Sequence, residues 1–247
     1  MEWTETRGIP LLEVALPGAR VAFSGRKGGV SAAPWDTLNL GLLTGDRPER
    51  VRENRHLLAG ALDLDPARVA IGRQVHGAGL AAHVEPQAGA PYAEPGQVEP
   101  PAVDGHHTAE PDLALLVFVA DCLPIAVTGS RGLAMLHGGW RGLAAGIVAA
   151  GCKEIDGSAA VIGPGIGPCC YEVGDEVLAA FASLGSEVAS GRMLDLGGVA
   201  EALLVRAGVE VVARSELCTR CNPELLFSHR GQGPDTGRQA GLIWGVA

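Results

Sequence analysis

The chain has 247 residues, of which 47% are hydrophobic and 36 are glycine, and its formal net charge is −9. This length and composition predict a globular protein with a sizeable core and exclude a disordered chain. The negative charge argues against a surface that binds nucleic acid, and with no apolar run of about 18 residues and no signal-peptide pattern we expect a cytoplasmic protein without membrane contact.

Strand-like runs and helical patterns alternate along the chain. Strands are predicted at residues 20–24, 68–72, 113–120, 124–128, 132–137, 159–163 and 209–213, and helices at 48–62, 141–155, 174–184 and 197–208. Residues 85–103 are rich in proline, glycine and alanine and predict an exposed loop excursion rather than a linker to a second domain. We therefore expect an α/β fold in which a single domain spans residues 1–247.

Residues 119–142 place reactive side chains at the ends of two predicted buried strands. Asp121 and Cys122 precede the first strand, His137 ends the second, and Gly138, Gly139 and Arg141 follow it. Core strands usually end in ordinary turn residues. Reactive side chains at these positions therefore indicate a site that a rigid sheet holds in place.

His76, in the segment QVHG, joins Cys122 and His137 as a candidate metal ligand. The three residues are dispersed along the chain, unlike the closely spaced pairs of structural zinc modules. Two imidazoles and a thiolate can bind Zn²⁺ and leave the fourth position to a water molecule, whose pKa then falls to about 7. A buried cysteine and two packed histidines are the alternative, and the spacing alone leaves both open.

The same three residues also form the ligand set of a blue-copper site. Met135 lies on the same strand face as His137, where an axial thioether could sit. A multicopper oxidase needs many histidines for its trinuclear cluster, commonly in His-x-His pairs, whereas this chain has seven histidines and no such pair. The sequence therefore argues against multicopper chemistry, and a single copper ion remains an alternative to zinc.

Two glycine-rich segments could bind an anion. Gly138, Gly139 and Arg141 lie just before a predicted helix, where backbone amides and an arginine can hold an oxyanion. Arg26, beside two glycines in FSGRKGGVS, offers a similar pattern. Ordinary glycine turns are the alternative for both segments.

The other cysteines are Cys152, Cys169, Cys170, Cys218 and Cys221. In a chain without a secretion signal, cysteines are more often thiols or metal ligands than disulfides. Cys218 and Cys221 could form a redox pair or a zinc site with Cys169 and Cys170, and packed thiols are the simpler interpretation.

A set of motifs occurs in the order seen in one bacterial family. The motifs are FSGRKGGVS, LNLGLLTGD, ENR, QVHG, ADCLPI, HGGWRG, IGPGIGPCCYEVG and FSHRG followed by TGRQAGLI. Together they resemble the purine nucleoside phosphorylase family formerly labelled laccase-domain or polyphenol oxidase proteins, which includes the peptidoglycan editing factor. The resemblance covers nearly the whole chain.

The resemblance implies a domain of mixed sheets flanked by helices, related to the cytotoxic-necrotizing-factor-like cysteine hydrolases. It implies a zinc ion at His76, Cys122 and His137. It also implies phosphorolysis of adenosine, inosine, guanosine and methylthioadenosine to the free base and ribose 1-phosphate, together with deamination of adenosine. Purine nucleosides and phosphate are then the expected partners of a monomeric enzyme.

Two further residues receive expected roles on this basis. Arg141, with the amides of Gly138 and Gly139, would anchor phosphate, and Asp121 would carry a proton or orient a metal ligand. The rival interpretations are a cysteine-dependent hydrolase of cell-wall precursors with Cys122 as its nucleophile, a copper-dependent polyphenol oxidase, and an interaction module with a closed structural zinc site.

The chain departs from the family pattern at three places. HGGWRG replaces the commoner His-Ala-Gly-Trp-Arg-Gly, which is a small change. VDGHHT has His106 and His107 where the family usually has apolar residues, and these could add a ligand or a base or be loop histidines. SHRG lacks the second arginine often found there, which leaves Arg230 alone.

Overall fold

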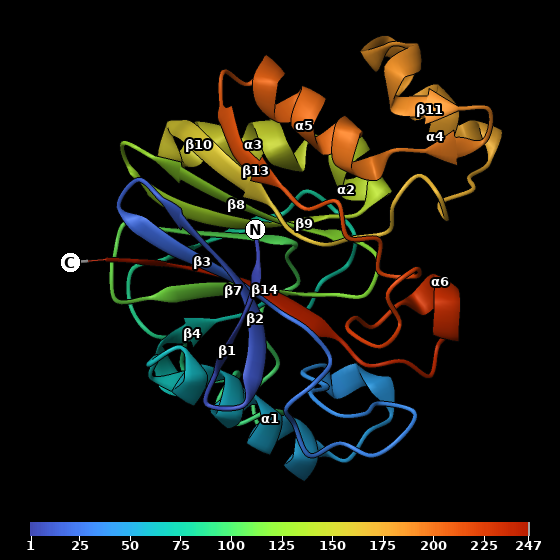
Figure 1. Cartoon of the computed structure of the whole chain (residues 1–247). Helices are drawn as coiled ribbons and strands as arrows, with labels where there is room; N and C mark the ends of the chain where they lie inside the picture. The colour runs from blue at the N-terminus through green and yellow to red at the C-terminus, as the bar shows by residue number, and fades with distance from the viewer. Residues whose placement is uncertain (247) are drawn as a thin grey trace.

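The computed structural model describes residues 1–246, in which two six-stranded sheets stack face to face with helices on their outer faces (Figure 1). The first sheet has the order β1(Trp3–Thr6), β2(Ile9–Leu16), β3(Ala19–Ser24), β14(Gln239–Gly245), β7(Ala114–Val119), β4(Val69–Ala70). The second has the order β13(Glu210–Arg214), β10(Gly157–Ile162), β8(Leu123–Gly129), β9(Gly132–Gly138), β6(Gly105–Thr108), β5(Leu80–His83). Strands β11(Ala189–Ser190) and β12(Met193–Leu194) form a small separate ribbon.

Helices cover the outer face of each sheet. The α-helices are α1(Pro48–Ala61), α2(Trp140–Ala144), α3(Ile147–Ile155), α4(Asp175–Ala180), α5(Leu196–Arg206) and α6(His229–Gln232), and the 3₁₀-helices are η1(Leu42–Thr44), η2(Pro66–Arg68), η3(Ala182–Leu184) and η4(Ser186–Val188). Helix α1 packs on the first sheet, whereas α3 and α5 pack on the second (Figure 1). None of the described helices is long and apolar enough to cross a membrane.

The apolar runs of the sequence are strands that are buried on both faces. In β7, Leu115 and Val117 pack between the two sheets, and Ala114 and Leu116 pack toward α1. Successive strand residues point to opposite faces, so a strand covered on both sides needs apolar residues at every position. The predicted α/β fold with mixed sheets is confirmed, and the relation to cysteine hydrolases stays a prediction.

The predicted helix at 141–155 is wrong as one element. Gly146 has a φ of +92° and separates α2 from α3. This left-handed conformation costs glycine little, because glycine has no Cβ to clash with the backbone. The break turns α3 so that Ile147, Val148 and Cys152 pack onto the second sheet.

The expectation of an exposed excursion at residues 85–103 is also wrong in part. The segment has no regular helix or strand, as expected. However, the Tyr92 side chain is fully buried, and its hydroxyl donates a hydrogen bond to the carbonyl of Arg55 in α1 at 2.9 Å. Tyr92 therefore anchors the segment to the body of the protein.

Candidate functional site

The register of the β8–β9 hairpin brings Cys122 and His137 together. Leu123 pairs with Gly138 and Pro124 with His137, at the open end of the hairpin. Cys122 directly precedes β8, so its thiol lies beside the last residues of β9. Cys122 and His137 thus meet because the tight turn between Gly129 and Gly132 folds β9 back on β8.

Asp104 positions both histidines of the site. It precedes β6, which pairs with β9, and its fully buried carboxylate accepts a hydrogen bond from His137 Nδ1 at 2.8 Å. The same carboxylate accepts from the backbone amides of Val75, His76 and Gly77 at 3.1, 2.8 and 2.7 Å. Because Nδ1 of His137 is used in this way, its Nε2 is the nitrogen left to face Cys122.

Two residues of the site have unusual backbone conformations. His76 has a φ of +60° and Asp121 a φ of +94°. A positive φ is costly for residues with a side chain, by about 1–3 kcal/mol, and such strain gathers at functional sites. The contacts of Asp104 hold His76, and three donors hold the Asp121 carboxylate: Thr219 Oγ1 at 2.5 Å, Ser228 Oγ at 2.7 Å and the Arg230 amide at 2.6 Å.

The side chains of His76, Cys122 and His137 form a group that fits a metal ion. Their potential ligand atoms lie within 4.8 Å of one another, and the two imidazole rings are edge to face with centroids 4.9 Å apart. Gly139 closes one side, where a Cβ atom would lie 3.1 Å from Cys122 Sγ and 3.2 Å from His76 Cδ2. Two imidazoles and a thiolate, one ring fixed by a carboxylate, are a donor set that suits zinc.

The surroundings of Cys122 and His137 favour their charged forms. Burial disfavours the thiolate, but the charge of His137 and hydrogen bonds from His137 and His76 lower the pKa of Cys122 to about 6. Burial likewise disfavours the imidazolium, but Cys122 and Asp104 raise the pKa of His137 to about 9. The Asp104 carboxyl is also buried, yet hydrogen bonds from His137 and the amides of Gly77 and Val75 hold its pKa below the usual value.

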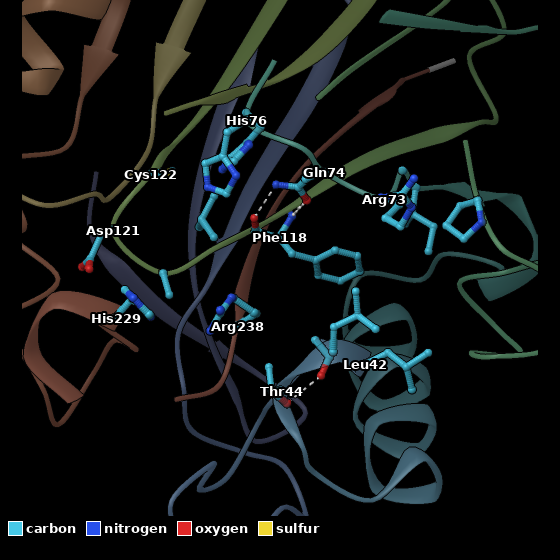
Figure 2. Close-up of a pocket in the computed structure, with 18 of the residues that line it drawn as sticks. Leu42, Thr44, Arg73, Gln74, His76, Phe118, Asp121, Cys122, His229 and Arg238 are labelled. Carbon is cyan, nitrogen blue, oxygen red and sulfur yellow. Dashed lines mark hydrogen bonds between the residues drawn. The ribbon is translucent and has the colours of Figure 1, made fainter. Parts of the chain in front are cut away.

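This group lies at one end of a cavity of about 620 Å³. His76 and Cys122 are at that end, Leu42 and Thr44 are at the other, and Phe118 and Arg238 lie between them (Figure 2). Its other polar or aromatic lining residues include Arg55, Arg73, Gln74, Glu99, Asp121, Tyr171, His229 and Arg230. The segment at residues 85–103 supplies part of the wall through Pro91, Gly96, Val98, Glu99 and Pro100.

Aromatic rings and cations share this cavity. Phe118 is fixed by Gln74, which both donates to its carbonyl and accepts from its amide at 2.8 Å (Figure 2). The Arg230 guanidinium lies over the Tyr171 ring, 5.3 Å from its centroid. Burial lowers the pKa of Arg238, against the charges of Cys122 and Asp121, which raise it.

The predicted anion-binding residues Gly138, Gly139 and Arg141 are outside the set of described residues that line the cavity, although Gly139 adjoins the His76–Cys122–His137 group. A Cβ atom on Gly138 would meet Ile125 in the core at 2.8 Å, and the Gly139 amide donates to the His137 carbonyl at 3.2 Å. The Arg141 guanidinium lies over the ring of Trp140, 4.5 Å from its centroid. Helix α2 has only five residues, so it offers little of the dipole that the prediction required.

Arg26 is bound within the fold. Its Nε donates to the Asp36 carbonyl at 2.8 Å and its Nη1 to the Pro223 carbonyl at 2.7 Å, and its guanidinium stacks on Phe227. Its guanidinium thus ties two loops together.

Of three other residues singled out in the sequence, Met135 and His106 are core residues and His107 is half-buried. Met135 is fully buried between the sheets and lies outside the set of described residues that line the cavity. His106 is fully buried, its Nδ1 lies 3.0 Å from His83 Nε2, and it is outside the set of described residues that line the cavity. Burial and the charge of His83 lower the pKa of His106 to about 3. His107 is half-buried on the same strand.

Sequence reasoning missed Asp104, Phe118, Tyr171 and Arg238. The signal for Asp104 was its place directly before a short strand in VDGHHT, and the signal for Arg238 was the motif TGRQAGLI. Both residues reach the site through strand pairings that are distant in sequence.

Comparisons with known proteins agree over almost the whole chain. A family model described as multi-copper polyphenol oxidoreductase laccase matches residues 20–245. A purine nucleoside phosphorylase of Streptomyces coelicolor is 39% identical over 241 residues, covering 92% of this chain and 96% of that protein. The purine nucleoside phosphorylase YfiH of Escherichia coli is 35% identical over 240 residues, covering 92% and 94%.

A solved structure has the same fold. The crystal structure of the hypothetical protein YfiH from Bacillus licheniformis superposes with a TM-score of 0.88 at 29% identity, covering 99% of both chains. The arrangement of two sheets and their helices is therefore shared across the full length.

Proposed function

We propose, from the premise that this chain belongs to the multi-copper polyphenol oxidoreductase laccase family, that it is an enzyme that cleaves purine nucleosides with phosphate. The observation that carries the proposal is one cavity that combines a His/Cys metal-ligand group with aromatic rings and arginines. Curated relatives named purine nucleoside phosphorylase support the same conclusion.

The cavity suits a nucleoside in size and lining. Its volume of about 620 Å³ falls within the range of about 300–1,000 Å³ typical of small-molecule sites. Phe118 and Tyr171 offer ring surfaces on which a purine can stack. The two hydrogen bonds between the Gln74 side chain and the Phe118 backbone hold that backbone in place before substrate binds.

We place phosphate at Arg230 and Arg238 rather than at Arg141. Both arginines line the cavity, whereas the Arg141 guanidinium rests on Trp140. Nη1 of Arg238 donates to the carbonyls of Thr236 and Gly237 at 3.0 and 2.9 Å, which fixes the direction of its guanidinium. A fixed, half-buried guanidinium binds an oxyanion strongly, because little side-chain entropy is lost and little water competes.

The reaction requires a phosphate oxygen to bond to C1′ as the glycosidic C–N bond breaks. The bonding electrons leave with the purine, which takes up a proton, and ribose 1-phosphate remains. The arginines hold phosphate within reach of C1′. The Asp121 carboxylate, which three hydrogen-bond donors fix in place, stabilises the positive charge that develops on the ribose. A zinc ion held by His76, Cys122 and His137 would supply Lewis acidity for the departing base and for deamination of adenosine.

We favour zinc over copper for this group. Among residues 1–246, the groups that could bind a metal are His76–Cys122–His137 and a set of four cysteines. A trinuclear copper cluster needs many more histidines in one place than the two in the first group. Both groups match ligand sets that zinc uses in proteins.

A second candidate function rests on the alignment of Cys122, His137 and Asp104. A thiol with a pKa near 6 beside an imidazole that a carboxylate orients is the arrangement of a cysteine hydrolase. In that case Cys122 would attack an amide carbonyl, such as one in a cell-wall precursor, and metal would inhibit the reaction. The two functions therefore respond to metal in opposite directions.

Product analysis with adenosine and inosine tests the proposal. We expect zinc-loaded protein to release free base and ribose 1-phosphate only when phosphate is present, and we expect Cys122→Ala and His137→Ala to reduce turnover at least about 100-fold. Cys152→Ala is the matched control, because Cys152 packs in the core away from the cavity lining, and it should keep turnover within a few-fold. Zinc-loaded protein that releases no base would overturn the proposal, and amide hydrolysis that increases on metal removal would favour the second candidate.

A further inference from the structure

Four cysteines from two distant segments meet beside the active-site cavity. Cys169 and Cys170 follow β10 in the loop before α4, and Cys218 and Cys221 lie in the loop between β13 and α6. Their four sulfur atoms all lie within 4.8 Å of one another. We propose that these cysteines bind a second metal ion, a structural zinc.

The sulfur positions fit one tetrahedral ion. Cys221 Sγ lies 3.5 Å from Cys169 Sγ and 3.4 Å from Cys170 Sγ. A zinc ion with Zn–S bonds of about 2.3 Å places its sulfurs about 3.8 Å apart, so small shifts of these side chains complete the site. An iron–sulfur cluster, which holds several ions and sulfides between its ligands, needs more widely spaced thiolates.

The backbone around Cys218 fixes the position of its side chain. Cys218 is buried, with 5% of its surface exposed. The loops are held together without metal by a bridge between Gly165 and Cys218 and by the Thr219 amide, which donates to the Gly165 carbonyl at 3.0 Å. Gly167 has little room for a side chain, because a Cβ atom there would lie 3.1 Å from Cys218 Cβ and 3.4 Å from Cys169 Sγ.

Zinc binding at this site requires proton release from the thiols but no oxidation or reduction. Each thiol that becomes a ligand loses one proton to solvent, and four thiolates surround the ion. All four protein ligands are present, so the site is closed and has no open position for substrate. Its role is therefore structural, unlike that of the three-ligand group at Cys122.

The site would stiffen one wall of the cavity. Tyr171 directly follows Cys170 and lines the cavity. Thr219 lies between the ligands Cys218 and Cys221, and its hydroxyl donates to the Asp121 carboxylate at 2.5 Å. Zinc would thus cross-link the two loops that carry the Tyr171 ring and one of the three donors to Asp121.

Metal content per chain tests the proposal independently of catalysis. We expect two zinc ions per chain in the full-length protein purified with a thiol reductant and without chelator. Cys218→Ser/Cys221→Ser and Cys122→Ser should each hold one, and Cys152→Ala should still hold two. The double variant should also melt at least about 5 °C lower than Cys152→Ala, because a cross-link between distant segments is lost.

Thiol protection in the unaltered protein gives a second readout if the double variant fails to fold. Alkylation followed by peptide mass analysis should find Cys169, Cys170, Cys218 and Cys221 protected, and all four should react once a strong chelator removes zinc. A single zinc per chain with these four thiols freely alkylated, or a disulfide among them in unreduced protein, would overturn the proposal. Neither outcome depends on whether the protein cleaves nucleosides.

Discussion

At the scale of single residues, Asp104 does the most to shape the site. One carboxylate accepts from the ring of His137 and from three consecutive amides that include the one of His76. It thereby fixes the ring of one candidate ligand and the strained backbone of another. Asp104 is outside the set of described residues that line the cavity, so its effect on the cavity passes through His76 and His137.

Asp104→Asn should weaken metal binding at the cavity. The amide side chain has no charge and can accept fewer of the four hydrogen bonds, so His137 and His76 become less well oriented. We expect zinc affinity at this group to fall about 10–100-fold, as for other partners of ligating histidines. Competition with a chromophoric chelator measures the change, and the exposed Asp65→Asn serves as the control. Equal affinities in the two variants would contradict the assigned role of Asp104.

In metal-free protein, the Cys122 thiol should become reactive at a lower pH than an ordinary thiol. Its pKa of about 6 means that the thiolate is present above that pH and is lost as the pH falls below it. Iodoacetamide should therefore modify Cys122 with a midpoint near pH 6, whereas Cys152, whose pKa is raised to about 11, should stay unmodified up to pH 9. Peptide mass analysis at each pH reads both sites. A midpoint for Cys122 near 8.5, as in an unperturbed thiol, would show that the contacts with His137 and His76 are absent.

At the scale of elements, the turn between α2 and α3 depends on one glycine. Gly146 has open space around its Cβ position, so a side chain there meets no atom and the cost of substitution is the cost of its φ of +92°. Gly60, near the end of α1, also has open space but lies within the helix and outside the positive-φ residues. Alanine substitutions at Gly146 and Gly60 therefore report the energetic cost of the backbone conformation without a contribution from steric clashes.

Gly146→Ala and Gly60→Ala should change stability in opposite directions. We expect Gly146→Ala to lower the free energy of unfolding by about 1–2 kcal/mol, because alanine pays for the left-handed conformation. Gly60→Ala should raise it by about 0.4–1 kcal/mol, because alanine loses less entropy on joining a helix. Urea unfolding of both variants beside the parent protein measures the two values. A stabilising Gly146→Ala would mean that this backbone can relax to a negative φ.

The sequence predicts the central elements of this fold better than its edges. Strands such as β7, β8 and β9 are covered on both faces, so their apolar runs stand out. Strand β6 was missed because it carries two histidines, of which His106 is buried and is accommodated inside the protein by its contact with His83. Strand β2 was missed because Pro10 and Glu13 interrupt its apolar pattern.

The same contrast holds in the candidate site. Cys122 and His137 could be predicted to lie together, because one hairpin carries both. Asp104 could not, because its contact depends on the pairing of β6 with β9, which no local pattern reveals. Arg141 looked better suited to an anion than Arg238, because sequence shows neighbouring glycines but not which guanidinium faces a cavity.

At the scale of the whole molecule, strand β14 holds the first sheet together. It lies between β3 and β7 and pairs with both, so the N-terminal strands β1, β2 and β3 connect to β7 and β4 only through it. Strand β1 is at the edge of the same sheet and pairs only with β2. Removing a central strand and removing an edge strand should therefore have different consequences.

Truncation should distinguish these two positions. A chain that ends at residue 238 lacks β14, and we expect it to lose cooperative unfolding, because Leu242 and Ile243 leave two core clusters and β3 and β7 each lose one of their two partners. A chain without residues 2–6 lacks β1 and should still unfold cooperatively, with a lower melting temperature. Circular dichroism on heating compares the two. A cooperative transition in the chain that lacks β14 would contradict this account of the sheet.

The place of β14 also has a consequence for biosynthesis. A ribosome delivers β3 and β7 long before β14, so each strand lacks its partner on one side while the chain is being made. Both strands present unpaired backbone groups and apolar side chains during that time, which is the condition under which nascent chains aggregate or recruit chaperones. The second sheet, whose last strand β13 is at its edge, can assemble earlier. The candidate metal ligands Cys122 and His137, on the β8–β9 hairpin of that sheet, would then meet on the ribosome before the other half of the protein has folded.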